Sequence, residues 1–209
     1  MRIRVNKVIC TDTWDKIRKL SASIKYENPI KWLQYQIVRN SLQTNKIVSK
    51  FMANVSPECK YCLLESEQIS HLFWHCQIVS NFLNDVFTWV CNTGIEFNPT
   101  KDQFLFGYLK ENSNTPKNYL VLHLKKFIWS TKFKSTNSLT LVSFKNYFKN
   151  ILKDLEIIKK IDNKKTDNTA DFYVWNILLD LLSVESQDLA DHHHHHLLPE
   201  QYGAPHDEV

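Results

Sequence analysis

CKYCLLESEQISHLFWHC, residues 59–76, places three of the chain's five cysteines and two of its histidines within one short stretch. Cys59 and Cys62 form a Cys-x2-Cys pair, which can hold one metal ion between two thiolates of a single tight turn. Zinc in a closed structural site takes four ligands, commonly thiolate sulfur and imidazole nitrogen in a tetrahedron. The stretch therefore predicts a zinc site, provided that a second pair of ligands follows the turn.

Two choices for this second pair follow a spacer of eight residues. His71 with Cys76 gives Cys-x2-Cys-x8-His-x4-Cys, whereas His71 with His75 gives Cys-x2-Cys-x8-His-x3-His. On a regular helix His71 and His75 share a face, but His71 and Cys76 are about 140° apart at 3.6 residues per turn. The His71–Cys76 pair becomes reachable if His71 precedes the helix or lies at its frayed start. Geometry therefore leaves both choices open.

A catalytic role for the metal is disfavoured by the residues around it. A catalytic zinc keeps one position open for water and usually has a carboxylate base nearby, whereas four or five candidate ligands here can close the tetrahedron. Glu65 and Glu67 lie in the spacer, but the stretch has neither a His-x-Glu pairing nor His-Glu-x-x-His. We expect a structural zinc and no catalytic residue.

The scarcity of glycine, three residues in 209, favours a helical protein. Both β-sandwiches and nucleotide-binding α/β folds use glycine freely in turns and phosphate loops. Apolar residues at helical spacing predict a mainly α fold, in which a zinc knuckle at 59–76 joins two helices. The predicted helices cover about 32–52, 70–91, 116–133, 140–161 and 171–184, with a short buried turn or helix at 102–109.

Charge is distributed unevenly along the chain. Residues 1–100 carry 12 basic and 8 acidic side chains, residues 101–165 carry 14 and 5, and residues 166–209 carry 0 and 9. A basic middle followed by an acidic end indicates a surface that binds polyanions, or two segments that attract each other.

Three parts are expected along the chain. Residues 1–100 form a helical region that contains the knuckle, and residues 101–185 form a basic and then acidic helical region that packs on it. Residues 186–209 lack periodicity and hold five consecutive histidines, so we expect a disordered tail.

The expected compartment is intracellular, cytoplasm or nucleus. An odd number of cysteines clustered with histidines is typical of metal binding in a reducing compartment. No run of about 18 apolar residues occurs, so no membrane span is expected.

The flanks of the knuckle carry a resemblance. KWLQYQIVRNSLQTNKIVSKF (31–51) and CKYCLLESEQISHLFWHCQIVSNFLNDVFTWV (59–90) resemble the C-terminal region of reverse transcriptases from LINE-class non-LTR retrotransposons. That region has an aromatic-rich helix, Thr-Asn before a second helix, Cys-x2-Cys, a spacer with glutamates, His-Leu-Phe and a final cysteine. DQFLFGYL, NYLVLHLKKFIWSTKFK and SFKNYFKNIL are also similar to the family, so the resemblance covers about residues 11–162.

The resemblance implies a Cys-Cys-His-Cys knuckle whose zinc ligands are Cys59, Cys62, His71 and Cys76, with His75 left out. It also implies that the chain holds RNA or target DNA for the reverse transcriptase core of a parent polyprotein. The sequence lacks any Asp-Asp dipeptide, and hence the polymerase's Tyr-x-Asp-Asp motif, and no endonuclease motif can be assigned. We therefore expect a fragment, a degenerate copy or a detached domain that does not polymerise by itself.

Two functions remain open at this point. The first is binding of RNA or single-stranded DNA, with lysines pairing with phosphates and interleaved aromatic rings stacking on bases. The second is a structural or protein-interaction domain whose zinc serves only the fold, because lysines on helices usually form a solvated face. The oligomeric state is not predicted. The candidate nucleic-acid contacts are Lys125, Lys126, Lys132, Lys134, Lys145, Lys149 and Lys153.

Overall fold

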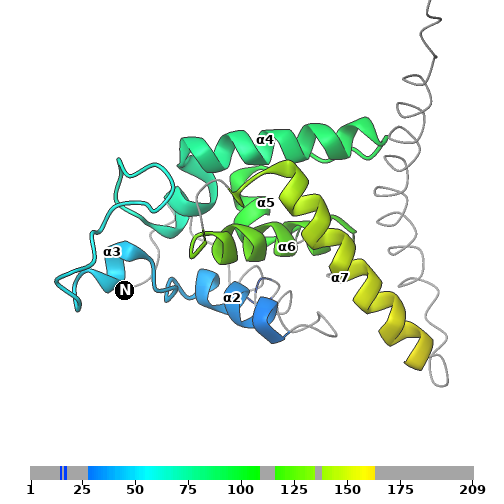
Figure 1. Cartoon of the computed structure of the whole chain (residues 1–209), viewed down its shortest axis with the longest axis horizontal. Coiled ribbons are helices and arrows are strands. Elements are labelled where there is room, and N and C mark those ends of the chain that lie inside the picture. The colour runs from blue at the N-terminus through cyan, green and yellow to red at the C-terminus, as the bar shows by residue number, and fades with distance from the viewer. Residues whose placement is uncertain (1–14, 16, 18–27, 109–115, 135–137, 163–209) are drawn as a thin grey trace, which may run out of the picture.

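A computed structural model describes residues 15, 17, 28–108, 116–134 and 138–162, with side chains in the last helix described as far as Asp154 (Figure 1). The predicted helix at 171–184 and the predicted tail at 186–209 lie outside the described residues.

The described residues are mainly helical, which confirms the predicted fold class. Their one piece of β pairing is an isolated antiparallel bridge between Glu58 and Ser66. None of the described helices is long and apolar enough to cross a membrane. In chain order the elements are α2 (Asn28–Val38), α3 (Asn45–Val48), the π-helix η1 (His71–His75), α4 (Gln77–Asn92), α5 (Lys101–Phe106), α6 (Pro116–Thr131) and α7 (Leu141–Asp162).

The single helix predicted over 32–52 is wrong, because the chain leaves the helix at Asn40. Asn40 adopts the left-handed conformation (φ 52°), its N–H donates to Ile37 O, and Ser41 N–H donates to Gln36 O. These two bonds are the pair that closes a helix when the residue after its end is left-handed, a position asparagine tolerates well. The chain then runs to the extended Thr44 and re-enters a short helix, α3.

Local signals place the other helices close to their predicted positions. Thr100 and Gln103 form a reciprocal capping box at the start of α5. Pro116 opens α6, where its missing N–H costs no helical bond. At the start of α7 the Thr140 hydroxyl accepts from Ser143 N–H at 3.2 Å.

Aromatic side chains from three helices form the centre of the core. The rings of Phe82 on α4, Phe127 on α6 and Phe144 on α7 lie with centroids 5.3–6.1 Å apart. Figure 1 shows α5 and α6 between α4 and α2, with α7 running obliquely across the helices; α2 packs against α5 and α6, and α7 packs against α4 and α6. One cluster of buried residues runs from Ile17 to Leu152, so the knuckle and the later helices share a core.

A buried lysine lies between α2, α5 and α6. Lys125 is 1% exposed, and its ammonium group donates to Gln34 Oε1 and, at 3.0 Å, to Leu105 O. Gln34 Nε2 also donates to Leu105 O, at 3.0 Å. Because burial penalises the charged amine, the pKa of Lys125 is lowered to about 7.

Lys125 should therefore make stability depend on pH. Its pKa is about 7 in the folded chain against 10.5 when unperturbed, so between these values the unfolded chain binds the extra proton. The stability of the wild type relative to Lys125→Met should rise across this interval, by up to about 1.4 kcal/mol per pH unit. Urea denaturation of both proteins from pH 7 to pH 9.5 measures the difference.

Lys126→Met is the matched control, since Lys126 is the neighbouring, half-buried lysine of the same helix. Its stability should run parallel to that of the wild type over the same range. Parallel curves for Lys125→Met as well would show that Lys125 is not held in its neutral form.

Candidate metal centre

Cys59 and Cys62 lie in a loop that is closed by backbone hydrogen bonds. Cys59 N–H donates to Glu65 O at 2.7 Å, and Leu63 N–H donates to Cys59 O at 2.9 Å. Leu63 is left-handed (φ 56°), which returns the chain sharply after Cys62. The loop therefore holds Cys59 and Cys62 on one turn, as the Cys-x2-Cys spacing predicts.

A π turn brings His71 and Cys76 together. Cys76 N–H donates to His71 O at 2.8 Å, five residues back, so residue 76 lies above residue 71 rather than 140° away from it. Cys76 then leaves helical conformation (ψ 123°) and caps α4. The continuous helix predicted over 70–91 is thus interrupted at the candidate ligand.

The four candidate side chains form one compact cluster. The ligand atoms of Cys59, Cys62, His71 and Cys76 all lie within 4.8 Å of one another. Cys59 Sγ and Cys76 Sγ are 3.8 Å apart, and Cys62 Sγ and His71 Nε2 are 3.3 Å apart. In a zinc tetrahedron with Zn–S near 2.3 Å and Zn–N near 2.05 Å, two sulfurs lie about 3.8 Å apart, and a sulfur and a nitrogen lie about 3.6 Å apart. The cluster is thus close to the size that zinc demands.

Cys59 and Cys76 share one hydrogen bond, which shifts the pKa values of their thiols in opposite directions. Hydrogen bonding to Cys76, followed by burial, raises the pKa of Cys59 well above its usual range. The same hydrogen bond lowers the pKa of Cys76. A divalent ion held between these sulfurs displaces the proton and stabilises both thiolates.

Glu65 lies beside the far nitrogen of the imidazole. Its Oε2 is 3.1 Å from His71 Nδ1, although the approach is not aligned as a hydrogen bond. Carboxylates in this position orient metal-binding histidines. Because the Glu65 side chain is 71% exposed, solvent screens the contact.

Glu67 joins the knuckle to the helices. This carboxylate is fully buried and accepts hydrogen bonds from Asn45 N–H (2.7 Å), Lys60 N–H (3.1 Å) and the Lys132 ammonium group. The bonds tie the start of α3, the metal loop and the end of α6 to one carboxylate. Sequence reasoning missed this role, since Glu67 and Lys132 are 65 positions apart and nothing local pairs them.

Tyr61, inside the Cys-x2-Cys turn, makes a second connection to α6. Its buried hydroxyl donates to Ile128 O at 2.6 Å and lies 3.1 Å from Thr131 Oγ1. Burial raises the pKa of Tyr61 above its usual range, so the phenol stays protonated and able to donate. The metal loop thus lies directly on the carboxyl end of α6.

His75 and Cys91 stand apart from the cluster. His75 is exposed, and among the described residues the metal-sized group excludes it. Burial, followed by the charge of Lys101, lowers the pKa of His75. Cys91 is exposed at the end of α4.

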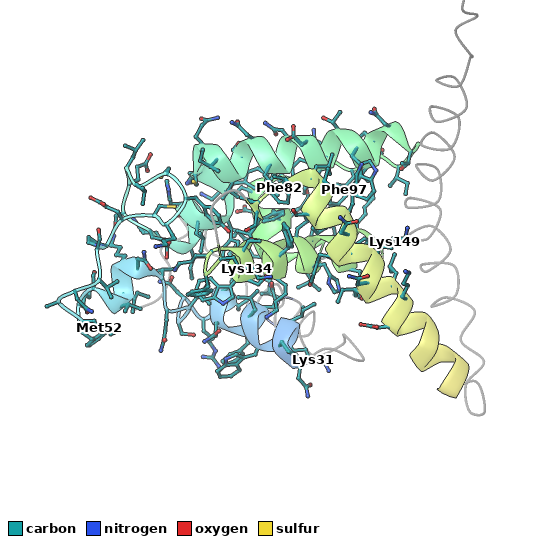
Figure 2. The ribbon with its side chains drawn as sticks, viewed as in Figure 1. Lys31, Met52, Phe82, Phe97, Lys134 and Lys149 are labelled. Carbon is teal, nitrogen blue, oxygen red and sulfur yellow. The ribbon has the colours of Figure 1, made fainter. Side chains whose placement is uncertain are left out.

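The predicted nucleic-acid contacts require a correction at two positions. Lys125 and Lys132 are buried, held by carbonyl oxygens and by Glu67 respectively, so neither presents its charge to a ligand. Both lie on α6 or directly after it, where the apolar pattern gave no sign that lysines face inward. The others differ in exposure: Lys126 and Lys145 are half-buried, and Lys134, Lys149 and Lys153 are exposed. Figure 2 places Lys134 and Lys149 on different elements.

Residues 6–82 match the family described as zinc-binding in reverse transcriptase. The matched range includes all four clustered residues and supports a reverse-transcriptase-associated zinc-binding region, an accessory part distinct from the catalytic polymerase domain. No curated protein and no solved structure matches the chain.

Loss of either thiol of the metal loop should remove the metal. We expect Cys59→Ser and Cys62→Ser to abolish zinc in the purified chain and to destabilise it by several kcal/mol, because a closed site contributes folding energy directly. Elemental analysis and thermal denaturation measure the two effects. Cys91→Ser is the control, and should keep both zinc content and stability. Equal zinc in all three variants would exclude the cluster as the metal site.

The buried ion pair can be tested separately from the metal. Glu67→Gln keeps the side chain's shape but leaves the Lys132 ammonium buried without its counterion, so the free energy of unfolding should fall by about 3–5 kcal/mol. Adding Lys132→Met should restore part of the loss, because the unpaired charge is then gone. Urea denaturation with zinc present measures both variants.

Glu58→Gln, which changes an exposed carboxylate of the same loop, should shift stability by less than about 1 kcal/mol. A Glu67→Gln protein as stable as the Glu58→Gln control would refute the role given to this junction.

Proposed function

We propose that this chain is a zinc-stabilised nucleic-acid-binding module of a LINE-class non-LTR retrotransposon reverse transcriptase. The module is non-catalytic by itself and holds RNA or target DNA beside the polymerase core. The observation that carries the proposal is the cluster of three cysteines and one histidine, built into the core of a chain that matches the reverse-transcriptase zinc-binding family.

In this proposal Cys59, Cys62, His71 and Cys76 hold zinc, which supplies folding energy and leaves no ligand position for a reaction. Two features support a structural role. Cys59, His71 and Cys76 are buried in the core, and the loop between the ligands is fixed to α6 through Tyr61 and Glu67. A metal so placed keeps the surfaces of the surrounding helices in a constant arrangement.

The exposed lysines of α7 supply the charge for a polyanion. Lys149 and Lys153 are exposed one turn apart, and Lys145, one turn earlier, has its ammonium 4.9 Å from the ring centroid of Trp89. Like charges at four-residue spacing repel by a few tenths of a kcal/mol per pair, a cost that bound phosphates offset.

The alternative, a protein-interaction domain, is favoured by one specific observation. Phe51 and Leu64 are 83% and 84% exposed, in the loops after α3 and within the knuckle. A protein partner would cover both side chains. In the reverse-transcriptase context the partner is the polymerase core, so this surface is compatible with nucleic-acid binding elsewhere.

Titration of the zinc-loaded chain with single-stranded RNA and DNA tests the proposal. Binding should be about micromolar at low salt and should weaken steeply as salt rises. Lys149→Gln/Lys153→Gln should lower the affinity and reduce the slope of log K against log salt by about 0.7 per lysine. Asn146→Gln/Asn150→Gln, a double change on exposed uncharged positions of the same helix, is the matched control. Absence of wild-type binding at low salt would leave the protein-interaction alternative.

A further inference from the structure

The outward side of α2 carries two stacked aromatic rings, Trp32 and Tyr35, and Arg39, the residue directly after the helix, lies over the second ring. The rings of Trp32 and Tyr35 lie with centroids 5.5 Å apart and planes 17° from parallel. The guanidinium carbon of Arg39 is 5.4 Å from the centroid of the Tyr35 ring. At spacings of three and four residues the three side chains share one helix face. They form a row of three planar π groups, with Tyr35 in the middle along the helix.

The fold does not require these aromatic residues. The inward side of α2 is formed by Ile30, Leu33 and Ile37, all buried. Trp32 and Tyr35 remain 61% and 41% exposed. A single exposed apolar side chain is ordinary, but two adjacent stacked rings under a guanidinium form a contiguous surface that points to a ligand.

Charge identifies the class of ligand. Residues 28–57 contain four basic side chains, Lys31, Arg39, Lys46 and Lys50, and no acidic one. Figure 2 shows Lys31 on the α2 segment that carries the stack. A helix that presents flat aromatic rings, a guanidinium plane and a lysine matches the bases and phosphates of an unpaired strand. An apolar protein partner would use the rings but leave this charge unpaired.

We propose that Trp32 and Arg39, at the two ends of this row, offer their outer faces to the unpaired bases of single-stranded RNA or DNA, with Tyr35 supporting both and Lys31 of the same helix available for the phosphates. The inference rests on the proposed function and gives it a second surface, on α2 rather than α7. It predicts a preference for unpaired strands, because the bases of a duplex are not free to stack on protein rings.

The test uses the full zinc-loaded chain and fluorescein-labelled oligo(dT) and oligo(U), each also presented as a duplex. Trp32→Ala should weaken binding to both single strands by roughly 5- to 150-fold, the range for losing one stacked base. Duplex binding and the salt slope should stay unchanged, because no charge is removed. Arg39→Lys should weaken the same probes at an unchanged salt slope, because it keeps the charge and loses the plane.

Phe51→Ala is the matched control, since Phe51 is an exposed aromatic residue of the same basic segment but lies outside the stack. It should bind like the wild type. Zinc content and the thermal midpoint of Trp32→Ala should be unchanged, as expected for a largely exposed side chain.

The outcomes separate the two proposals. If the wild type binds and Trp32→Ala binds equally well, the stacking surface is wrong while the proposed function stands. The stacking surface is also wrong if Trp32→Ala lowers single-strand and duplex binding alike, or if it only converts a dimer into a monomer in sedimentation. If the wild type binds no nucleic acid, the proposed function itself fails and the stacking surface fails with it.

Discussion

The carboxylate of Glu67 is the junction on which the arrangement of this chain depends. It receives the first N–H of α3, an N–H of the metal loop and the ammonium group of Lys132 after α6. Each donor belongs to a different segment of the chain, and the carboxylate is fully buried. A buried charge is tolerated only when it is paired and hydrogen-bonded. The buried carboxylate and ammonium group are therefore fully paired only when all three segments come together.

Sequence reasoning was most accurate where the governing interactions are local. The start of α6 at Pro116 and the mainly α class follow from residues a few positions apart, and so does the short spacing that brings Cys59 next to Cys62. The contacts between residues far apart in the chain could not be predicted from the sequence. A lysine on a helix reads as a solvated residue, and the burial of Lys125 follows from Gln34 and Leu105 O, 91 and 20 positions away. The π turn was also missed, because a single turn of five residues leaves no periodic signal.

The proposed division of labour follows from these placements. The metal cluster lies inside the shared core, away from the exposed lysines of α7 and the stacked rings of α2. In this proposal the metal stabilises the fold, and nucleic acid is bound by the lysines of α7 and the aromatic rings of α2. In the same proposal the exposed apolar side chains of the loops, Phe51 and Leu64, remain available for a protein contact. One small domain can thus present separate surfaces to protein and to nucleic acid.

Cys76 is both the last residue of the metal cluster and the N-cap residue of α4, so the start of this helix is attached directly to the cluster. The helix has 16 residues and is about 24 Å long at 1.5 Å per residue. Trp89, near the far end of α4, has its ring centroid 4.9 Å from the Lys145 ammonium on α7. We expect that loss of a metal bound to Cys76 would loosen the start of α4, and that any change carried along this helix would reach the basic side chains of α7 through that contact.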